Sequence, residues 1–204
     1  MMYLAIRVLL VLVISSPCLG QTRQTITLYS EPDCGERGNQ ETFRGACEDL
    51  SICGGKMPDN VAKSVRSTGA WTVYYDSDFD DALSMPTSIF GLQMCQNLAL
   101  AGESTSLRFA GSPILEEDTI TLYEKSYFRG EEYYFTEPRV ADFTADVQSV
   151  VITGPLSWSL YTLPNFDGAS FCVNPTMVNF IGFSFDLENE FGINRIRSFE
   201  RGCE

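Results

Sequence analysis

A four-residue pattern that occurs four times along the chain constrains its fold more than any other feature. Each copy consists of a bulky apolar residue, a hydroxyl residue, an aliphatic residue and a tyrosine. The copies are residues 26–29, 71–74, 120–123 and 158–161. Alternating runs rich in Val, Thr, Tyr and Trp are typical of half-buried strands. Because internal repeats indicate repeated structural units, we expect four similar β units.

The residues after each tyrosine predict a folded hairpin. The fifth residue after the tyrosine is phenylalanine in the second, third and fourth units, and Cys34 in the first. The seventh residue is glycine in the last two units, at Gly130 and Gly168, whereas the first unit has its glycine one place early, at Gly35. Glycine permits a positive backbone φ close to an aromatic ring, as a tight hairpin requires. The first unit is therefore expected to be a degenerate copy.

Each unit closes with a second stretch of strand-like sequence. The stretch contains an aliphatic residue and a short alternation, and it ends in glycine. The four stretches are residues 64–69, 106–111, 149–154 and 196–202. The 16 Gly and 9 Pro are spread throughout the chain, and no long window sustains a helical period. We therefore expect an all-β protein.

The connections between units predict two domains. The first and second units join directly at residues 69–71, and the third and fourth join through residues 154–158. The second and third units are separated by residues 112–118, which include a proline and three consecutive acidic residues. Short connections within pairs and a polar connection between them place a boundary near residue 115. The expected domains are residues 21–113 and 114–204.

Residues 1–20 have the pattern of a secretory signal peptide. Arg7 precedes an apolar run over residues 8–14, and the small residues Cys18 and Gly20 occupy the two positions that a signal peptidase reads. The alternative is a membrane anchor, but a spanning helix needs about 20 apolar residues and no run approaches that length. We expect cleavage before Gln21 and a secreted, extracellular protein without a membrane span.

Removal of Cys18 with the signal peptide leaves six cysteines, an even number. They are Cys34, Cys47, Cys53, Cys95, Cys172 and Cys203. In an oxidising compartment such a set predicts disulfides. A zinc cluster is the alternative, but the spacing of Cys47 and Cys53 does not match a metal knuckle and the chain has no histidine. If each domain closes its own bridges, Cys172 pairs with Cys203, and the first four cysteines pair in one of three ways.

These patterns resemble the βγ-crystallin superfamily, most closely at residues 123–130 and 149–168. Its unit is a four-stranded Greek key with a Tyr-x4-Phe-x-Gly hairpin, and two units form a domain. The resemblance is strong over residues 118–204 and weak over 22–113. It implies two Greek-key β-sandwich domains, each built from two similar units. Since the superfamily includes lens, epidermal, microbial and inhibitor proteins, the resemblance leaves the function open.

The resemblance also implies where calcium would bind, at loops with two Asn or Asp residues followed by two hydroxyl residues. Calcium prefers several oxygen ligands, which such loops supply. The first unit keeps Asp59, Asn60 and Ser64 but has a lysine in place of the first hydroxyl residue, and the second unit keeps Thr105 and Ser106. The two incomplete loops could complement each other across the first domain. We expect at most a weak site there, and none in the second domain, where residues 144–149 and 190–195 do not match.

Charge and composition narrow the function further. A formal net charge of -13 argues against nucleic acid or an anionic membrane as the main partner. The absence of histidine removes imidazole catalysis, and neither a distinct carboxylate pair nor a phosphate-binding loop is present. We expect a non-enzymatic structural or binding protein whose partner is an unknown extracellular protein or matrix component. The alternative is a secreted protease inhibitor or a toxin or defence protein that presents residues 48–58.

Overall fold

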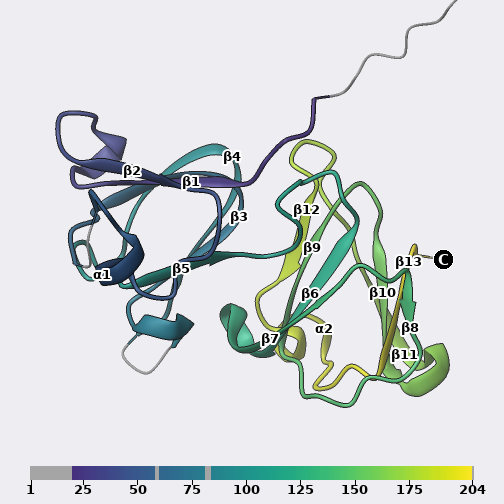
Figure 1. Ribbon diagram of the computed structural model, residues 1–204. Helices are drawn as coiled ribbons and strands as arrows, with labels where there is room; N and C mark the ends of the chain where they lie inside the picture. Colours follow the sequence, from purple (N-terminus) through teal and green to yellow (C-terminus); the bar gives the residue numbers. More distant parts are fainter. Residues whose placement is uncertain (1–19, 58–59, 81–83, 204) are drawn as a thin grey trace, which may run out of the picture.

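The computed structural model describes residues 20–57, 60–80 and 84–203, and the predicted signal peptide lies almost wholly outside them. The fold is all-β, with two lobes joined through the chain between β5 and β6 (Figure 1). The strands are β1 (Thr25–Tyr29), β2 (Gln40–Phe43), β3 (Ser64–Tyr74), β4 (Thr87–Asn97), β5 (Ser106–Phe109), β6 (Thr119–Lys125), β7 (Arg129–Phe135), β8 (Arg139–Val140), β9 (Ser149–Thr153), β10 (Trp158–Leu163), β11 (Asp167–Val173), β12 (Ile181–Ser184) and β13 (Ser198–Arg201). Short helical segments are α1 (Leu50–Cys53), α2 (Leu187–Phe191), η1 (Pro32–Cys34), η2 (Ser77–Phe79), η3 (Ser126–Phe128) and η4 (Pro164–Phe166).

The C-terminal half, from β6 to β13, contains two four-stranded antiparallel sheets. Their strand orders are β12-β9-β6-β7 and β11-β10-β13-β8. Strand β8 follows β6 and β7 in sequence but pairs with β13, and β12 pairs with β9 of the preceding unit. This exchange of the third strand makes each unit a Greek key and binds two units into one sandwich. The fold class predicted from the sequence is therefore confirmed.

The N-terminal half, from β1 to β5, achieves the same exchange with one continuous sheet. The first part of β3 pairs with β1 and its second part pairs with β5. The partner strand β4 follows β3 along both parts, with a register shift between Ser67 and Gly69. Gly69 has φ of +116° and faces Gly91, with φ of +150°, at this bulge. Two strands that are separate in the C-terminal half are thus merged here into one long, bent strand.

The repeated pattern supplies the cores of both halves. Its first and third residues point inward and are fully or almost fully buried. They are Ile26, Leu28, Trp71, Val73, Ile120, Leu122, Trp158 and Leu160. Each half has its own apolar cluster around one of the two tryptophans, Trp71 or Trp158. The period of two in the sequence therefore has a direct cause, since alternate strand residues face the inside of a sandwich.

A third apolar cluster packs the two halves against each other. It includes buried Ala110 from the N-terminal half and buried Leu115, Tyr123 and Phe128 from the connection and the C-terminal half. Phe90 of β4 lies against this cluster, with its ring centroid 5.2 Å from that of Phe128. The halves therefore share buried aromatic surface in addition to the covalent connection.

A charged group is enclosed at the same junction. Arg108 of β5 donates from Nε to the Tyr74 hydroxyl (2.9 Å) and lies 3.2 Å from a Glu132 carboxylate oxygen of β7. Its guanidinium carbon is 5.2 Å from the ring centroid of Tyr123 and 4.9 Å from that of Phe79. Burial raises the pKa of Glu132 above its ordinary value, although the neighbouring arginine opposes this shift. The junction thus combines apolar packing with an ion pair between the two halves.

Candidate cation-binding loops and the hairpins they support

The hairpin after each repeated tyrosine has a backbone that most residues avoid. In the third unit Tyr127 and Phe128 have φ of 62° and 60°, and equivalent pairs of non-glycine residues occur in the other three units. Gly130 and Gly168 also have positive φ, as predicted from the sequence. A non-glycine residue in this region costs about 1–2 kcal/mol. The positive φ of these two successive residues was not predicted from the sequence, because neither residue is a glycine.

A serine opposite each repeated tyrosine fixes this hairpin. Ser149, which pairs with Tyr123 in the strand register, donates its hydroxyl hydrogen to the Lys125 carbonyl (2.7 Å). The same oxygen accepts from the N–H of Phe128 (3.0 Å). Ser64, Ser106 and Ser198 make the equivalent pair of bonds in the other units. The final serines of the two candidate calcium loops, Ser64 and Ser106, therefore have a structural role in their hairpins, as Ser149 and Ser198 do in the other units.

The residue before each of these serines also has an equivalent position in all four units. Its N–H donates to the carbonyl oxygen of the repeated tyrosine, at 2.8–2.9 Å. These residues are Lys63, Thr105, Gln148 and Arg197. The loops therefore align as residues 59–64, 101–106, 144–149 and 193–198. The loop predicted in the fourth unit, 190–195, was three residues out of register, because α2 and its left-handed cap Gly192 (φ 71°) occupy the start of that segment.

The structure brings the two loops of the N-terminal half side by side. The N–H of Asn60 donates to the carbonyl of Ser104 (3.1 Å), and the N–H of Gly102 donates to the carbonyl of Ala62 (2.7 Å). The predicted residue Asp59 lies outside the described residues. Thus Asn60 does lie beside the loop of the second unit, as the sequence suggested.

The other predicted ligands of the N-terminal half are mostly engaged by the protein itself. Ser64 and Ser106 are buried and turned toward their hairpins, and the Thr105 hydroxyl donates to the Tyr75 carbonyl at 3.3 Å. Ser104 was not singled out from the sequence, yet its buried hydroxyl has no hydrogen-bond partner among residues 20–57, 60–80 and 84–203. Within those same residues, no group of three or more His, Cys, Asp or Glu side chains could hold a metal. A cation here would depend on hydroxyl, amide and carbonyl oxygens.

In the C-terminal half, Arg197 occupies the position equivalent to Lys63. Nη1 of Arg197 donates to the carbonyl oxygens of Thr144 (2.9 Å) and Ala145 (3.1 Å) in the loop of the third unit. Nη2 of the same guanidinium lies 4.0 Å from the exposed carboxylate of Asp146. A tethered positive charge thus gathers the oxygens that a bound cation would use. The absence of a calcium site from the second domain stays a prediction.

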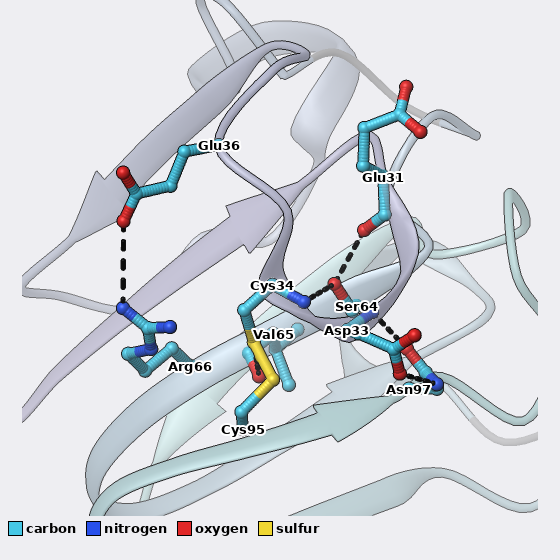
Figure 2. Close-up of a disulfide and its surroundings, with 9 residues drawn as sticks. All are labelled: Glu31, Asp33, Cys34, Glu36, Ser64, Val65, Arg66, Cys95 and Asn97. Atoms are coloured by element: carbon cyan, nitrogen blue, oxygen red, sulfur yellow. Dashed lines mark hydrogen bonds and ion pairs between the residues drawn. A yellow bond between two sulfur atoms is a disulfide. The ribbon is translucent and has the colours of Figure 1, made fainter.

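The first unit holds its hairpin with a disulfide instead of an aromatic ring. In the other three units a phenylalanine packs on the repeated tyrosine, with centroid distances of 5.6–5.9 Å. Cys34 takes that position and is bonded to Cys95 of β4 (Figure 2). Beside it, the N–H of Asp33 donates to Asn97 Oδ1 (2.7 Å), and Asn97 Nδ2 donates to Asp33 Oδ1 (2.8 Å). The hairpin is therefore tied covalently and by side-chain bonds to the next unit.

The other two disulfides also lie each within one half. Cys172 is bonded to Cys203, which is the pairing expected from the sequence. Cys47 is bonded to Cys53, six residues away, and closes a loop that contains α1. Asp49 caps α1 by accepting from the N–H of Ser51.

This disulfide-closed loop presents an apolar residue to solvent. Ile52 is 84% exposed, whereas Leu50 on the same short helix is fully buried. An open pocket of about 480 Å³ lies between the loop and the hairpin of the second unit, which are joined where the N–H of Asp78 donates to the carbonyl of Glu48 (2.8 Å). Its lining includes Glu48, Asp49, Ile52, Ser77 and Asp78. In the segment predicted for the inhibitor hypothesis, residues 51–53 are exposed whereas Leu50 and Met57 are buried, and Pro58 at its predicted end lies outside the described residues.

Comparison with known proteins identifies the fold. No protein-family model matches the sequence, and no curated protein matches it. Among solved structures, Geodin, a βγ-crystallin from Geodia cydonium, is similar with a TM-score of 0.59 and 19% identity, over 88% of this chain and 99% of Geodin. Protein S, solved in complex with calcium, matches over 86% of this chain and 98% of its own at 17% identity, with a TM-score of only 0.34. The likeness to Geodin shows the βγ-crystallin fold that the resemblance implied.

In the described part of the chain, no helix is both long enough and apolar enough to cross a bilayer.

Proposed function

We propose that this chain with the βγ-crystallin fold is a secreted, non-enzymatic structural or binding protein of an extracellular fluid or matrix. The bond between Cys34 and Cys95 carries the proposal. It replaces the aromatic contact that fixes the hairpin in the other three units, so the first unit depends on an oxidised pair. Structural disulfides persist in oxidising compartments and are rare in the cytosol. The signal-like residues 1–20 independently support the same location.

Expression of the full-length chain in a secretory eukaryotic cell line tests this location. We expect the protein in the medium, with its N-terminus at residue 21 and without free thiols. Peptide mapping under non-reducing conditions should recover the bonds Cys34–Cys95, Cys47–Cys53 and Cys172–Cys203. Retention of the protein in the cytosol with reduced cysteines would contradict the proposal.

Calcium is a subordinate part of the proposed function and is confined to the N-terminal half. The adjacent loops at Asn60 and Ser104, together with the unmatched Ser104 hydroxyl, support a weak site. The lysine at position 63 and the internal bonds of Ser64 and Ser106 keep it weak, so we expect a dissociation constant of about 0.1–1 mM, as in extracellular modules. Isothermal titration should detect binding in the native chain and not in Asn60→Ala. Identical melting temperatures with chelator and with millimolar calcium would show that the folded protein does not bind calcium at these concentrations.

Protease inhibition is the second candidate, favoured by the exposed Ile52 on its disulfide-closed loop. The native chain should inhibit at least one protease in a panel of extracellular proteases, and the Ile52→Asp variant should not inhibit it. This substitution changes an exposed side chain and leaves Leu50 in the core. Because residues 50–53 are helical and a substrate-like loop is extended, inhibition would proceed by blocking access rather than by occupying the cleavage site. Absence of inhibition at micromolar protein would reject this candidate.

A further inference from the structure

The segment that follows the predicted cleavage site is clamped onto the connection between the two halves. The buried side chain of Gln24 accepts from the N–H of Ala70 (2.8 Å) and donates to the carbonyls of Ala110 (2.7 Å) and Ser112 (2.6 Å). Its backbone N–H donates to the carbonyl of Pro113 (2.8 Å). This short segment therefore satisfies backbone groups of the N-terminal half and of the connection that follows it.

The clamp ends one residue after the predicted cleavage site. The N–H of Thr22 donates to both carboxylate oxygens of Glu116 (3.1 and 2.9 Å), and the carbonyl of Thr22 accepts from the N–H of Leu115 (3.0 Å). Partial burial favours the neutral form of Glu116, but these hydrogen bonds outweigh it and lower the pKa of the carboxyl group. Gln21, the residue before Thr22, is exposed. The backbone is thus fixed at residue 22 and open to solvent at residue 21.

We propose that Gln21 is a modification site, where the N-terminal glutamine of the mature chain cyclises to pyroglutamate. This inference rests on the proposed function, because it needs the signal peptide to be removed before Gln21. The α-amino nitrogen attacks the side-chain carbonyl carbon Cδ. The bond between nitrogen and Cδ forms, the bond between Cδ and Nε2 breaks, and one molecule of ammonia leaves. No oxidant or reductant is required.

The structure accommodates this reaction without loss of the clamp. Ring closure needs rotations only within Gln21, whose side chain faces solvent. The N–H of Thr22 belongs to the next peptide bond, so it remains available to Glu116 after the ring has formed.

The modification would protect the junction from exopeptidases. An aminopeptidase that removes Gln21 reaches Thr22 and, two residues later, the buried Gln24, which holds the start of the connection against the N-terminal half. A lactam has no free α-amine and blocks that enzyme at its first step. The modified residue therefore protects the contacts that hold the connection between the two halves in place.

The experiment has two arms that separate this inference from the proposed function. In the first arm, intact mass spectrometry of the protein secreted from eukaryotic cells should give the mass of residues 21–204 with three disulfides, less one ammonia. In the second arm, folded protein with an N-terminal Gln21, generated by a site-specific protease, is incubated with glutaminyl cyclase and should lose one ammonia. A free α-amine on Gln21 in both arms overturns the modification but leaves secretion intact. Secreted protein with a different N-terminus overturns the modification and the predicted cleavage together.

Gln21→Asn is the matched control. Its side chain is one carbon shorter and would need a strained four-membered ring, so it should keep its free amine while folding unchanged. We expect an aminopeptidase to trim Gln21→Asn past residue 21 and to leave the cyclised protein intact. Equal trimming of the two proteins would overturn the protective role assigned to the ring.

Discussion

The first and third units build the same hairpin with different chemistry. In the third unit the buried ring of Phe128 packs on Tyr123, with a centroid distance of 5.6 Å. In the first unit Cys34 holds the same position through its bond to Cys95. Both hairpins keep the two left-handed residues and the serine bonds. The fold therefore requires a strong tie at this position, and either apolar burial or a covalent bond can supply it.

The two halves also differ in how far they depend on disulfides. The N-terminal half has two disulfides and merges neighbouring strands into β3 and β4, whereas the C-terminal half has one disulfide and two separate sheets. Each half contains one of the two tryptophans, Trp71 or Trp158, fully buried. Fluorescence of variants with a single tryptophan can therefore follow each half separately.

Removal of the Cys34–Cys95 bond should produce the largest effect. For a separation of 61 residues, loop-closure entropy predicts a loss of about 4 kcal/mol in the free energy of unfolding. Denaturant unfolding of Cys34→Ala/Cys95→Ala, followed by Trp71 in a Trp158→Phe background, measures it. As a control, Cys172→Ala/Cys203→Ala should mainly lower the unfolding midpoint reported by Trp158 in a variant that keeps this tryptophan and has Trp71→Phe. An unchanged Trp71 midpoint would show that the disulfide does not hold the first unit.

Loss of the hairpin serine should come next and should differ between the units. Ser149→Ala removes the hydrogen bonds that the serine hydroxyl makes to the carbonyl of Lys125 and from the N–H of Phe128, at a cost of about 2 kcal/mol. Ser64→Ala should cost less, because the disulfide also holds Cys34 in place. Unfolding of both variants under oxidising and reducing conditions tests this difference, which should disappear after reduction. Equal costs in the oxidised protein would contradict the equivalence of the two ties.

Glu132→Gln should have a smaller effect that depends on pH. Because the pKa of Glu132 is raised in the folded protein, its contribution to stability is present below its unfolded pKa and lost as pH rises through the folded value. The variant has no such titration, so its stability relative to the native chain should increase as pH rises from roughly 4, near the ordinary pKa of glutamate. Urea unfolding over this range is the measurement. A constant difference between the proteins would mean that Glu132 does not titrate at the junction.

The smallest effect concerns calcium and the residues that precede the serines. Replacement of Lys63 or Arg197 by Thr removes a positive charge and adds an oxygen ligand, so calcium binding should strengthen in the half that carries the change. At a calcium concentration equal to the dissociation constant, the stabilisation is only about 0.4 kcal/mol. Calorimetric titration measures the affinity directly. If Arg197→Thr fails to gain binding, the arginine is not a substitute for a bound cation.

Much of the fold was predictable because it depends on local patterns. The alternation in residues 26–29 and its three copies reports which side chains face the core, and all eight inward residues are buried as a sandwich requires. The hairpin glycines also have the positive φ that was expected. The helix α2 was not foreseen, and it displaced the predicted loop of the fourth unit by three residues. A helix this short leaves no periodic signal in the sequence.

By itself, the sequence determined that the chain is all-β, that it repeats one unit four times and that it has an even set of cysteines after residue 20. Tertiary structure alone decided that Cys34 bonds to Cys95 and that each serine supports a hairpin. It also decided that Arg108 pairs with Glu132 of the other half and that Arg197 binds the loop of the third unit. The physical reason is the range of the interactions. Strand periodicity arises between neighbouring residues, whereas these bonds join side chains and backbone groups that only the folded chain brings together.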